Sequence, residues 1–210
     1  KVNELVITSF DEPTIFIMFR VIIENYLTFF YIFCDNISTE EKKFRMNVWK
    51  YSGLKQRSGF KATTEDSKLK LRNELVEIDN LKELINSSPF FISYKKEEQK
   101  QVLKGTKPRL FNTWVELNER SGFQTDLFKN LYGYKSNYTH SEFISILQIK
   151  SQNYGLNLNA KEHYTLLLLH SLVCKCILDL VEIFPSIKEL YYKQNSDLIK
   201  EIGFLKKIAI

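Results

Sequence analysis

The sequence predicts an all-α protein, built as a multi-helix bundle and forming a single domain over residues 1–210. Two features of the composition predict this class. Apolar residues make up 44% of the 210-residue chain, which is enough to form a core. Only seven Gly and four Pro interrupt the chain, whereas a many-stranded β fold needs turn residues about every 8–12 positions. Apolar positions that recur at spacings of three and four are a third indication of helices.

A first helix is expected over about residues 12–34, with Pro13 in its first turn, where the missing N–H has no helical partner. The segment is apolar almost all round, as in a membrane span or in the central helix of a bundle. Arg20 and Glu24 lie near its middle, and each charge costs about 2.5–3.5 kcal/mol at the centre of a bilayer. We therefore predict a buried helix of a soluble bundle and no membrane association.

Two charged helices are expected next, over about 39–57 and 64–86. The first begins with Glu40 and Glu41, whose negative charges suit the N-terminal end of the helix dipole. The second is amphipathic, because its apolar residues recur at helical spacing. These residues are Leu71, Leu75, Ile78, Leu81 and Ile85.

Residues 89–108 carry no clear pattern and are predicted to form a loop or an insertion. An apolar stretch is followed by an almost wholly charged one, and Gly105 and Pro108 then interrupt the chain. A short helix is expected around Trp114, and a longer one over about 125–139.

The clearest helical pattern covers residues 160–183. After it, Ser186 and Glu189 have the spacing of a capping box, which predicts a last helix that begins there. Within 160–183 one edge is polar and the opposite side is apolar. The polar edge comprises Ser171, Lys175, Asp179 and Glu182, and the apolar side comprises Leu166, Val173, Ile177 and Val181.

The three cysteines predict a reducing, cytoplasmic location. Cys34, Cys174 and Cys176 are odd in number and irregular in spacing, unlike a disulfide framework, and no secretory leader opens the sequence. His170 and Cys174 share a helix face but supply only two ligands, whereas a structural zinc site needs four. Since the sequence also lacks a Gly-rich phosphate loop, we expect no metal and no cofactor.

Positive charge is concentrated in one part of the chain. The whole chain carries a formal net charge of +5, whereas residues 40–110 hold 17 Lys or Arg against 10 Asp or Glu. An excess of this kind suits an acidic partner such as RNA. A second interpretation stays open, in which these charges only solvate the exposed faces of two helices.

Three polar residues recur every four positions along the predicted helix 125–139, the third of them just after its last residue. Tyr132, Ser136 and His140 would share one face of a continuous helix, and Lys135 flanks them. A His titrates near neutral pH and can exchange protons, and Lys, Ser and Tyr can bind phosphate oxygens. In the other interpretation His140 only ends the helix and bonds its last carbonyl groups.

Arg20 and Glu24 form a second polar pair, four residues apart on the most apolar helix. Buried charges need partners, so one interpretation is a structural ion pair. In the other interpretation Arg20 binds an anion and Glu24 holds it in position. Both interpretations stay open at the level of the sequence.

The two patterns together resemble those of an uncharacterised family of bacterial helical proteins. That family has an R-x3-E pair in a long first helix, here Arg20 and Glu24, and a later Y-x3-S-x3-H stripe, here Tyr132, Ser136 and His140. The resemblance covers most of the chain in layout and rests on these five residues.

The same family looks like the HEPN superfamily of helical bundles, many of which are metal-independent ribonucleases in bacterial toxin–antitoxin and defence systems. Their usual signature is an Arg followed, after four to six residues, by a His, in a composite site across a dimer. This sequence has Lys135 in place of that Arg, with four residues between it and His140. Lys is a point charge without the bidentate fork of a guanidinium.

The resemblance implies a HEPN-like bundle with a ribonuclease site, an RNA substrate, a homodimer and an unidentified partner protein. His140 would be the general acid/base in this site, Lys135 and Arg20 would stabilise the phosphorane, and the remaining polar residues would orient them. These remaining residues are Glu24, Tyr132 and Ser136. The alternative is a non-catalytic helical binding or scaffold module, in which the same side chains form a buried polar network that sets the helix register.

Overall fold

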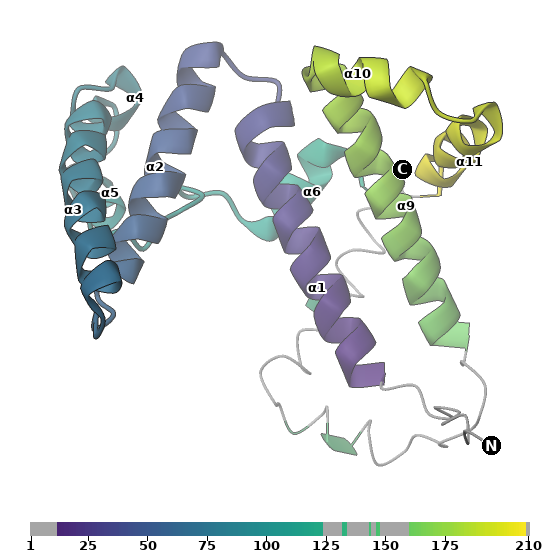
Figure 1. The fold of residues 1–210 in the computed structure, drawn as a ribbon, viewed down its shortest axis with the longest axis horizontal. Helices are drawn as coiled ribbons and strands as arrows, with labels where there is room; N and C mark the ends of the chain where they lie inside the picture. The colour runs from purple at the N-terminus through teal and green to yellow at the C-terminus, as the bar shows by residue number, and fades with distance from the viewer. Residues whose placement is uncertain (1–11, 124–131, 134–142, 144–145, 148–159, 209–210) are drawn as a thin grey trace. The chain divides into compact units, whose positions relative to one another are not determined.

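The computed structural model describes residues 12–123, 132–133, 143, 146–147 and 160–208. All regular structure within these ranges is helical and none of it is strand, which confirms the all-α class (Figure 1). The chain divides into two compact units. Unit 1 comprises residues 1–27 and 114–210, and unit 2 comprises residues 28–113.

Helix α1 begins in unit 1 and crosses into unit 2 after Leu27. The described helices of unit 1 are α1 (Glu12–Phe29), α6 (Trp114–Ser121), α9 (Ala160–Ile183), α10 (Pro185–Tyr192) and α11 (Ser196–Lys206). Those of unit 2 are the π-helical turn η1 (Phe30–Cys34), α2 (Thr39–Arg57), α3 (Glu65–Asn86), α4 (Pro89–Ile92) and α5 (Lys96–Leu103).

Helix α1 is a core helix of unit 1. Phe16, Phe19, Ile23 and Leu27 recur at spacings of three and four and are at most 1% exposed. In the part of the chain that the structure describes, only Thr14–Cys34 is long and apolar enough to span a membrane by length and composition. Core helices of soluble proteins pass the same test, so the cytoplasmic location stays a prediction.

Helices α9, α10 and α11 pack together around a small apolar core of unit 1. Its buried members come from all three helices: Cys174, Val181, Tyr191 and Ile202. The predicted capping box at Ser186 is wrong, because α10 begins one residue earlier with Pro185, whose ring suits the first position of a helix. A separate helix, α11, then begins after Asn195, whose side chain accepts a hydrogen bond from the Asp197 N–H at 2.8 Å.

Helices α2 and α3 begin and end where their sequences predict and pack on one another in unit 2. Ser38 caps α2 through the Glu41 N–H, and Thr64 and Ser67 form a capping box at α3. The predicted apolar face of α3 is only partly buried. Ile78, Leu81 and Ile85 are buried, whereas Leu75 is 45% exposed, because α2 covers a narrower stripe than the sequence pattern spans.

The segment predicted as a loop or an insertion, 89–108, instead contains helices α4 and α5. Pro89 begins α4, and the Glu98 side chain accepts a hydrogen bond from the Lys95 N–H where α5 begins. The Gln99 side-chain amide donates to the carbonyl oxygens of Phe91 and Tyr94, at 3.0 and 3.1 Å. These carbonyl groups lie at and just after the end of α4, and the Gln99 side chain connects them to α5.

A glycine fixes the end of α5 against α2. Gly105 has a φ of +75°, and a Cβ built on it would lie 2.9 Å from the Cβ and Cγ of Lys55. We expect Gly105→Ala to lower the free energy of unfolding by about 1–3 kcal/mol, because the new side chain meets both a left-handed backbone and a steric overlap. Urea unfolding monitored by tryptophan fluorescence measures this change.

Gly53→Ala is the matched control for this substitution. Gly53 lies within α2, and a Cβ built on it meets nothing within 4 Å. Alanine favours the helix over glycine by about 1 kcal/mol, so this variant is expected to be unchanged or more stable. Equal stability of the two variants would contradict the role of Gly105.

Candidate functional site

The Arg20–Glu24 pair on α1 is the first part of the candidate site. The Arg20 Nε donates to the Glu24 Oε1 at 2.7 Å, and the two side chains are 17% and 28% exposed. One helical turn separates the two residues, so α1 itself sets this contact. The ion pair that their spacing allows is therefore present, on a partly buried face.

Tyr132 joins this pair from a segment 108 residues further along the chain. Its hydroxyl group donates to the Glu24 Oε1 at 2.5 Å. The Arg20 guanidinium lies over the Tyr132 ring, 5.4 Å from its centroid, within the range of a cation–π interaction. The structure thus brings Arg20, Glu24 and Tyr132 together, and these three residues form what we call the α1 cluster.

Protonation in the α1 cluster follows from burial and charge. Burial raises the pKa of Tyr132 well above its ordinary range, and the hydrogen bond to Glu24 and the charge of Glu24 raise it further. Burial lowers the pKa of Arg20, but the hydrogen bond to Glu24 and the attraction of both partners outweigh that effect and raise it. The cluster therefore presents a permanent cation and a neutral phenol, and Tyr132 cannot serve as a base near neutral pH.

Lys135, Ser136 and His140 lie outside the described residues. Of the predicted Tyr–Ser–His stripe, only Tyr132 is therefore among the described residues, and it belongs to the α1 cluster. The roles assigned to all six residues stay predictions.

A second polar cluster connects α1 to α9 within unit 1, and the sequence did not indicate it. The Tyr26 hydroxyl donates to the Asp179 Oδ2 at 2.9 Å. The Lys175 Nζ lies 3.2 Å from the same oxygen and 5.5 Å from the centroid of the Tyr26 ring. Tyr26, Lys175 and Asp179 form what we call the α9 cluster.

The α9 cluster corrects the simple polar and apolar division of helix 160–183. Ser171 and Lys175, from the predicted polar edge, are buried, whereas Val173, from the predicted apolar side, is 46% exposed. Ser171 donates to the Leu167 carbonyl oxygen at 2.8 Å, so its hydroxyl group is satisfied within the helix. Lys175 and Asp179 are buried or partly buried because Tyr26 supplies a hydrogen bond and an aromatic face there, whereas Glu182 of the same edge is exposed.

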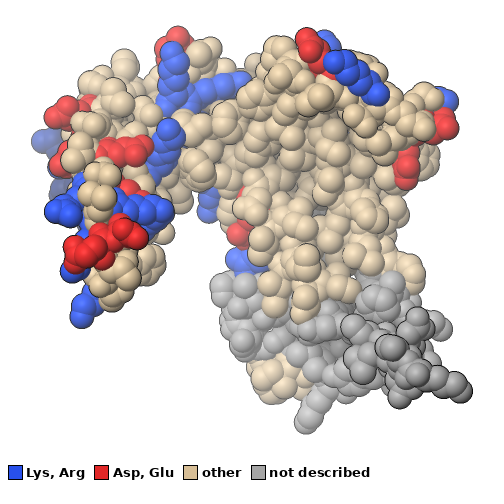
Figure 2. All heavy atoms as spheres, viewed as in Figure 1, with Lys and Arg blue, Asp and Glu red and all other residues tan. Residues whose placement is uncertain are grey.

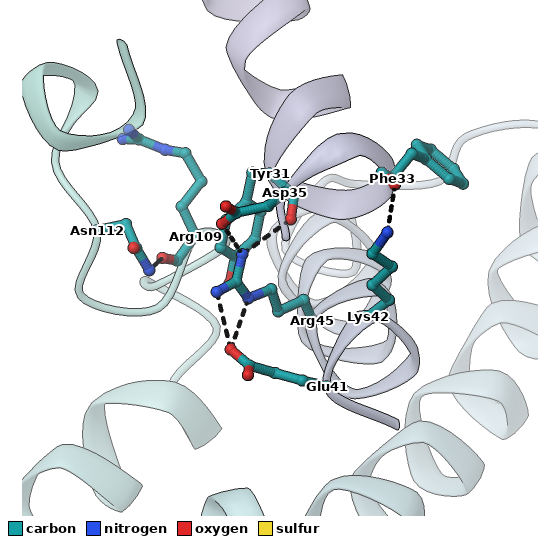
Figure 3. Close-up of polar contacts among 8 residues, drawn as sticks. All are labelled: Tyr31, Phe33, Asp35, Glu41, Lys42, Arg45, Arg109 and Asn112. Carbon is teal, nitrogen blue, oxygen red and sulfur yellow. Dashed lines mark hydrogen bonds and ion pairs between the residues drawn. The ribbon is translucent and has the colours of Figure 1, made fainter. Parts of the chain in front are cut away.

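A third cluster lies in unit 2 around Arg45, which is only 5% exposed (Figure 3). Its Nη1 donates to the Asp35 carboxylate at 2.7 Å and to the Tyr31 carbonyl oxygen at 3.0 Å. Its Nε and Nη2 both donate to the Glu41 Oε1, at 3.1 and 2.8 Å. The guanidinium carbon also lies 4.5 Å from the centroid of the Tyr31 ring. Arg45, Asp35, Glu41 and Tyr31 form what we call the Arg45 cluster.

The π-helical turn η1 makes the Arg45 cluster possible. The Asp35 N–H donates to the Phe30 carbonyl oxygen at 2.9 Å, five residues back. A regular α-helix would direct this N–H to the Tyr31 carbonyl oxygen instead. Because the turn is widened, that oxygen accepts from Arg45, and the Phe33 carbonyl oxygen accepts from the Lys42 Nζ at 2.7 Å (Figure 3).

All three clusters place a cation over a tyrosine ring and against a carboxylate, but they differ in exposure. The ion-paired side chains are 7% exposed for Arg45 and Asp35, and 8% and 13% exposed for Lys175 and Asp179. Arg20 and Glu24 are 17% and 28% exposed. Arg20 of the α1 cluster is therefore the most exposed of the three cations and the most accessible to a ligand, whereas Arg45 and Lys175 are almost fully buried.

Cys34, Cys174 and Cys176 form no disulfide with one another. Burial raises the pKa of Cys174 and Cys176, so these two thiols stay protonated near neutral pH. Within the described ranges, no three His, Cys, Asp or Glu side chains are grouped so as to hold a metal ion.

Comparisons with models of known protein families, with curated proteins and with solved structures found no match to this chain.

Proposed function

We propose that this chain is a HEPN-like bacterial protein of a defence or stress system and that it is a metal-independent endoribonuclease. The supporting observation is the α1 cluster. Tyr132, the first residue of the predicted Tyr–Ser–His stripe, meets the predicted Arg20–Glu24 pair although Tyr132 and Glu24 are 108 residues apart. One residue of the later stripe thus contacts the earlier pair, which supports a shared site.

The α1 cluster suits the recognition of a phosphodiester. Arg20 carries a permanent positive charge, and the contact between its Nε and Glu24 fixes the plane of the guanidinium. Tyr132 stays protonated and packs its ring against the same guanidinium. In this proposal Arg20 and Lys135 stabilise the charge of the phosphorane, while Glu24, Tyr132 and Ser136 orient them.

His140 is the proposed general acid/base. It accepts the proton of the ribose 2′-hydroxyl as the 2′ oxygen attacks the adjacent phosphorus. The new bond from the 2′ oxygen to phosphorus forms as the bond to the 5′ oxygen breaks, and the 5′ oxygen takes up a proton from water. The products are a 2′,3′-cyclic phosphate and a free 5′-hydroxyl group, and the step consumes no oxidant or nucleotide.

The test compares the purified protein with its His140→Ala variant on single-stranded RNA in EDTA. We expect the wild type to cleave and the variant to lose about 10²–10⁴-fold in rate, the usual contribution of a general acid/base. His170→Ala is the matched control, because His170 is an exposed residue of α9, and it should cleave like the wild type. Absence of cleavage by the wild type, or equal rates for His140→Ala and His170→Ala, would contradict the proposal.

The second candidate function is a non-catalytic helical binding or scaffold module. The observation that favours it is the repeated arrangement of the three clusters, two of which contain an almost fully buried cation. By this analogy Arg20 fixes the position of Tyr132 against α1 and does no chemistry. Arg20→Gln would then lower the melting temperature and leave RNA binding unchanged, whereas an endoribonuclease would lose cleavage in this variant and retain part of it in Arg20→Lys.

A further inference from the structure

Unit 2 contains a groove of about 530 Å³ beside α2. Trp49, Lys50 and Arg57 of α2 line it, together with Glu77 of α3 and Pro108. Trp49 is 41% exposed, which is unusual for the largest apolar side chain, since burial of this residue normally stabilises a core. The groove therefore has an aromatic surface with positive charge next to it.

A second, smaller groove of about 160 Å³ adjoins the first through Arg57, which lines both. Phe60, Lys61 and Lys70 line this second groove, and Phe60 is 75% exposed. Each groove thus offers one exposed aromatic ring and at least two cationic side chains.

Arg57 is held at the junction of the two grooves. Its Nη2 lies 3.0 Å from the Glu74 Oε1, and the Glu74 side chain is 12% exposed whereas the Arg57 side chain is 47% exposed. The carboxylate is therefore on the protein side of the pair, and the guanidinium keeps a large surface toward the solvent. This geometry orients an arginine for an external anion.

The charge of unit 2 agrees with an anionic ligand. Residues 28–113 contain 17 Lys or Arg and 11 Asp or Glu, a net charge of +6 in a chain whose total is +5. Figure 2 shows that charged side chains of both signs are densest over α2–α5, with smaller groups over α10 and α11, whereas the described surface of α1 and α9 carries few. Lys50, Arg57, Lys61 and Lys70 outnumber Glu74 and Glu77 along the two grooves.

We propose that these two grooves bind single-stranded RNA, with bases stacked on Trp49 and Phe60 and a phosphate at Arg57. Alternating aromatic and cationic side chains are what a single strand requires, because every base has a π face and every linkage has a charge. A duplex keeps its bases paired and stacked, so it cannot use the aromatic rings. The choice of RNA as the ligand rests on the proposed endoribonuclease function. The proposal adds to that function a substrate-binding surface within unit 2.

The test uses the small number of tryptophans in the chain. There are two, Trp49 and Trp114, so Trp114→Phe leaves Trp49 as the only one. The probe is an oligouridylate of about 12 nucleotides, a length within the usual range of single-strand sites, with 2′-O-methyl riboses that the proposed 2′-hydroxyl attack cannot cleave. We expect it to quench Trp49 fluorescence and to bind more weakly as salt is raised.

Substitutions in full-length protein then locate the surface. Trp49→Ala and Phe60→Ala are each expected to weaken binding of the same probe about 5- to 150-fold, the effect of removing one stacked base. Trp49→Phe should retain most of the affinity. Phe204→Ala is the matched control, because Phe204 is 65% exposed on α11 of unit 1, and it should bind like the wild type.

The proposal is overturned if the probe does not bind, if duplex RNA of equal length binds as tightly, or if Trp49→Ala and Phe60→Ala bind like Phe204→Ala. Absence of binding would leave the grooves to a protein partner. Binding of the methylated probe by a protein that does not cleave unmodified RNA would support this surface and refute the nuclease. Cleavage of unmodified RNA at the same rate in Trp49→Ala, Phe60→Ala and the wild type would support the nuclease and refute this surface.

Discussion

Arg45→Met is expected to lower the free energy of unfolding of unit 2 by about 3–5 kcal/mol, the usual cost of removing one partner from a buried ion pair. Asp35 is 5% exposed and accepts from Arg45 at 2.7 Å, so the substitution leaves a buried carboxylate without its cation. The substitution also removes the guanidinium that donates a hydrogen bond to the Tyr31 carbonyl oxygen in the widened turn η1. Urea unfolding of a Trp114→Phe background measures the change, because Trp49 then reports on unit 2 alone.

Two further variants test the cause of this loss. Arg45→Met combined with Asp35→Leu removes both charges and is expected to recover most of the stability, because a buried pair replaced by apolar residues is often neutral. Lys68→Met is the surface control: its partner is Glu65, the two side chains are 51% and 84% exposed, and the expected change is below about 1 kcal/mol. A loss in Arg45→Met no larger than this control would refute the role of the Arg45 cluster.

Asp179→Ala is expected to destabilise unit 1 by about 3–5 kcal/mol, for the same reason. The Lys175 side chain is 8% exposed and Asp179 is its carboxylate partner at 3.2 Å. The Tyr26 hydroxyl loses its acceptor as well, and α1 loses a direct link to α9. Unfolding is measured in a Trp49→Phe background, where Trp114 reports on unit 1.

The control for Asp179→Ala is Lys200→Ala on α11. Lys200 pairs with Asp197 at 3.2 Å, the same distance, but the two side chains are 76% and 84% exposed. Water already solvates both charges there, so we expect a change below about 1 kcal/mol. Similar losses in the two variants would show that burial does not set the strength of the α9 cluster.

Much of the secondary structure could be predicted from local sequence. The bounds of α2, α3 and α9 follow from acidic first turns, capping residues and apolar spacing, all of which act within a few residues. Helices α4 and α5 could not be predicted, because α4 has only four residues and α5 lies in an almost wholly charged stretch without clear apolar spacing. The Gln99 side chain bonds carbonyl groups at and after the end of α4, and this contact is seen only in the folded chain.

The candidate site divides along the same line. The spacing of Arg20 and Glu24 on one helix allowed a contact between them, since a helix brings residues four apart together, and the structure contains this ion pair. The presence of Tyr132 at Glu24 depends on packing over 108 residues. The sequence pattern suggested their association only through resemblance to a family, and the positions of Lys135, Ser136 and His140 lie outside the described residues.

The sequence by itself determined that this protein is all-α, where α2, α3 and α9 begin and end, and that residues 40–110 carry an excess of positive charge. The tertiary structure alone decided which polar side chains are buried. Arg45 and Lys175 look like ordinary surface charges in the sequence, yet a widened turn and a tyrosine ring from another helix give them partners in the interior. Burial of a charge depends on partners that lie far along the chain, whereas helix formation depends on neighbours, so only the folded protein reveals the clusters.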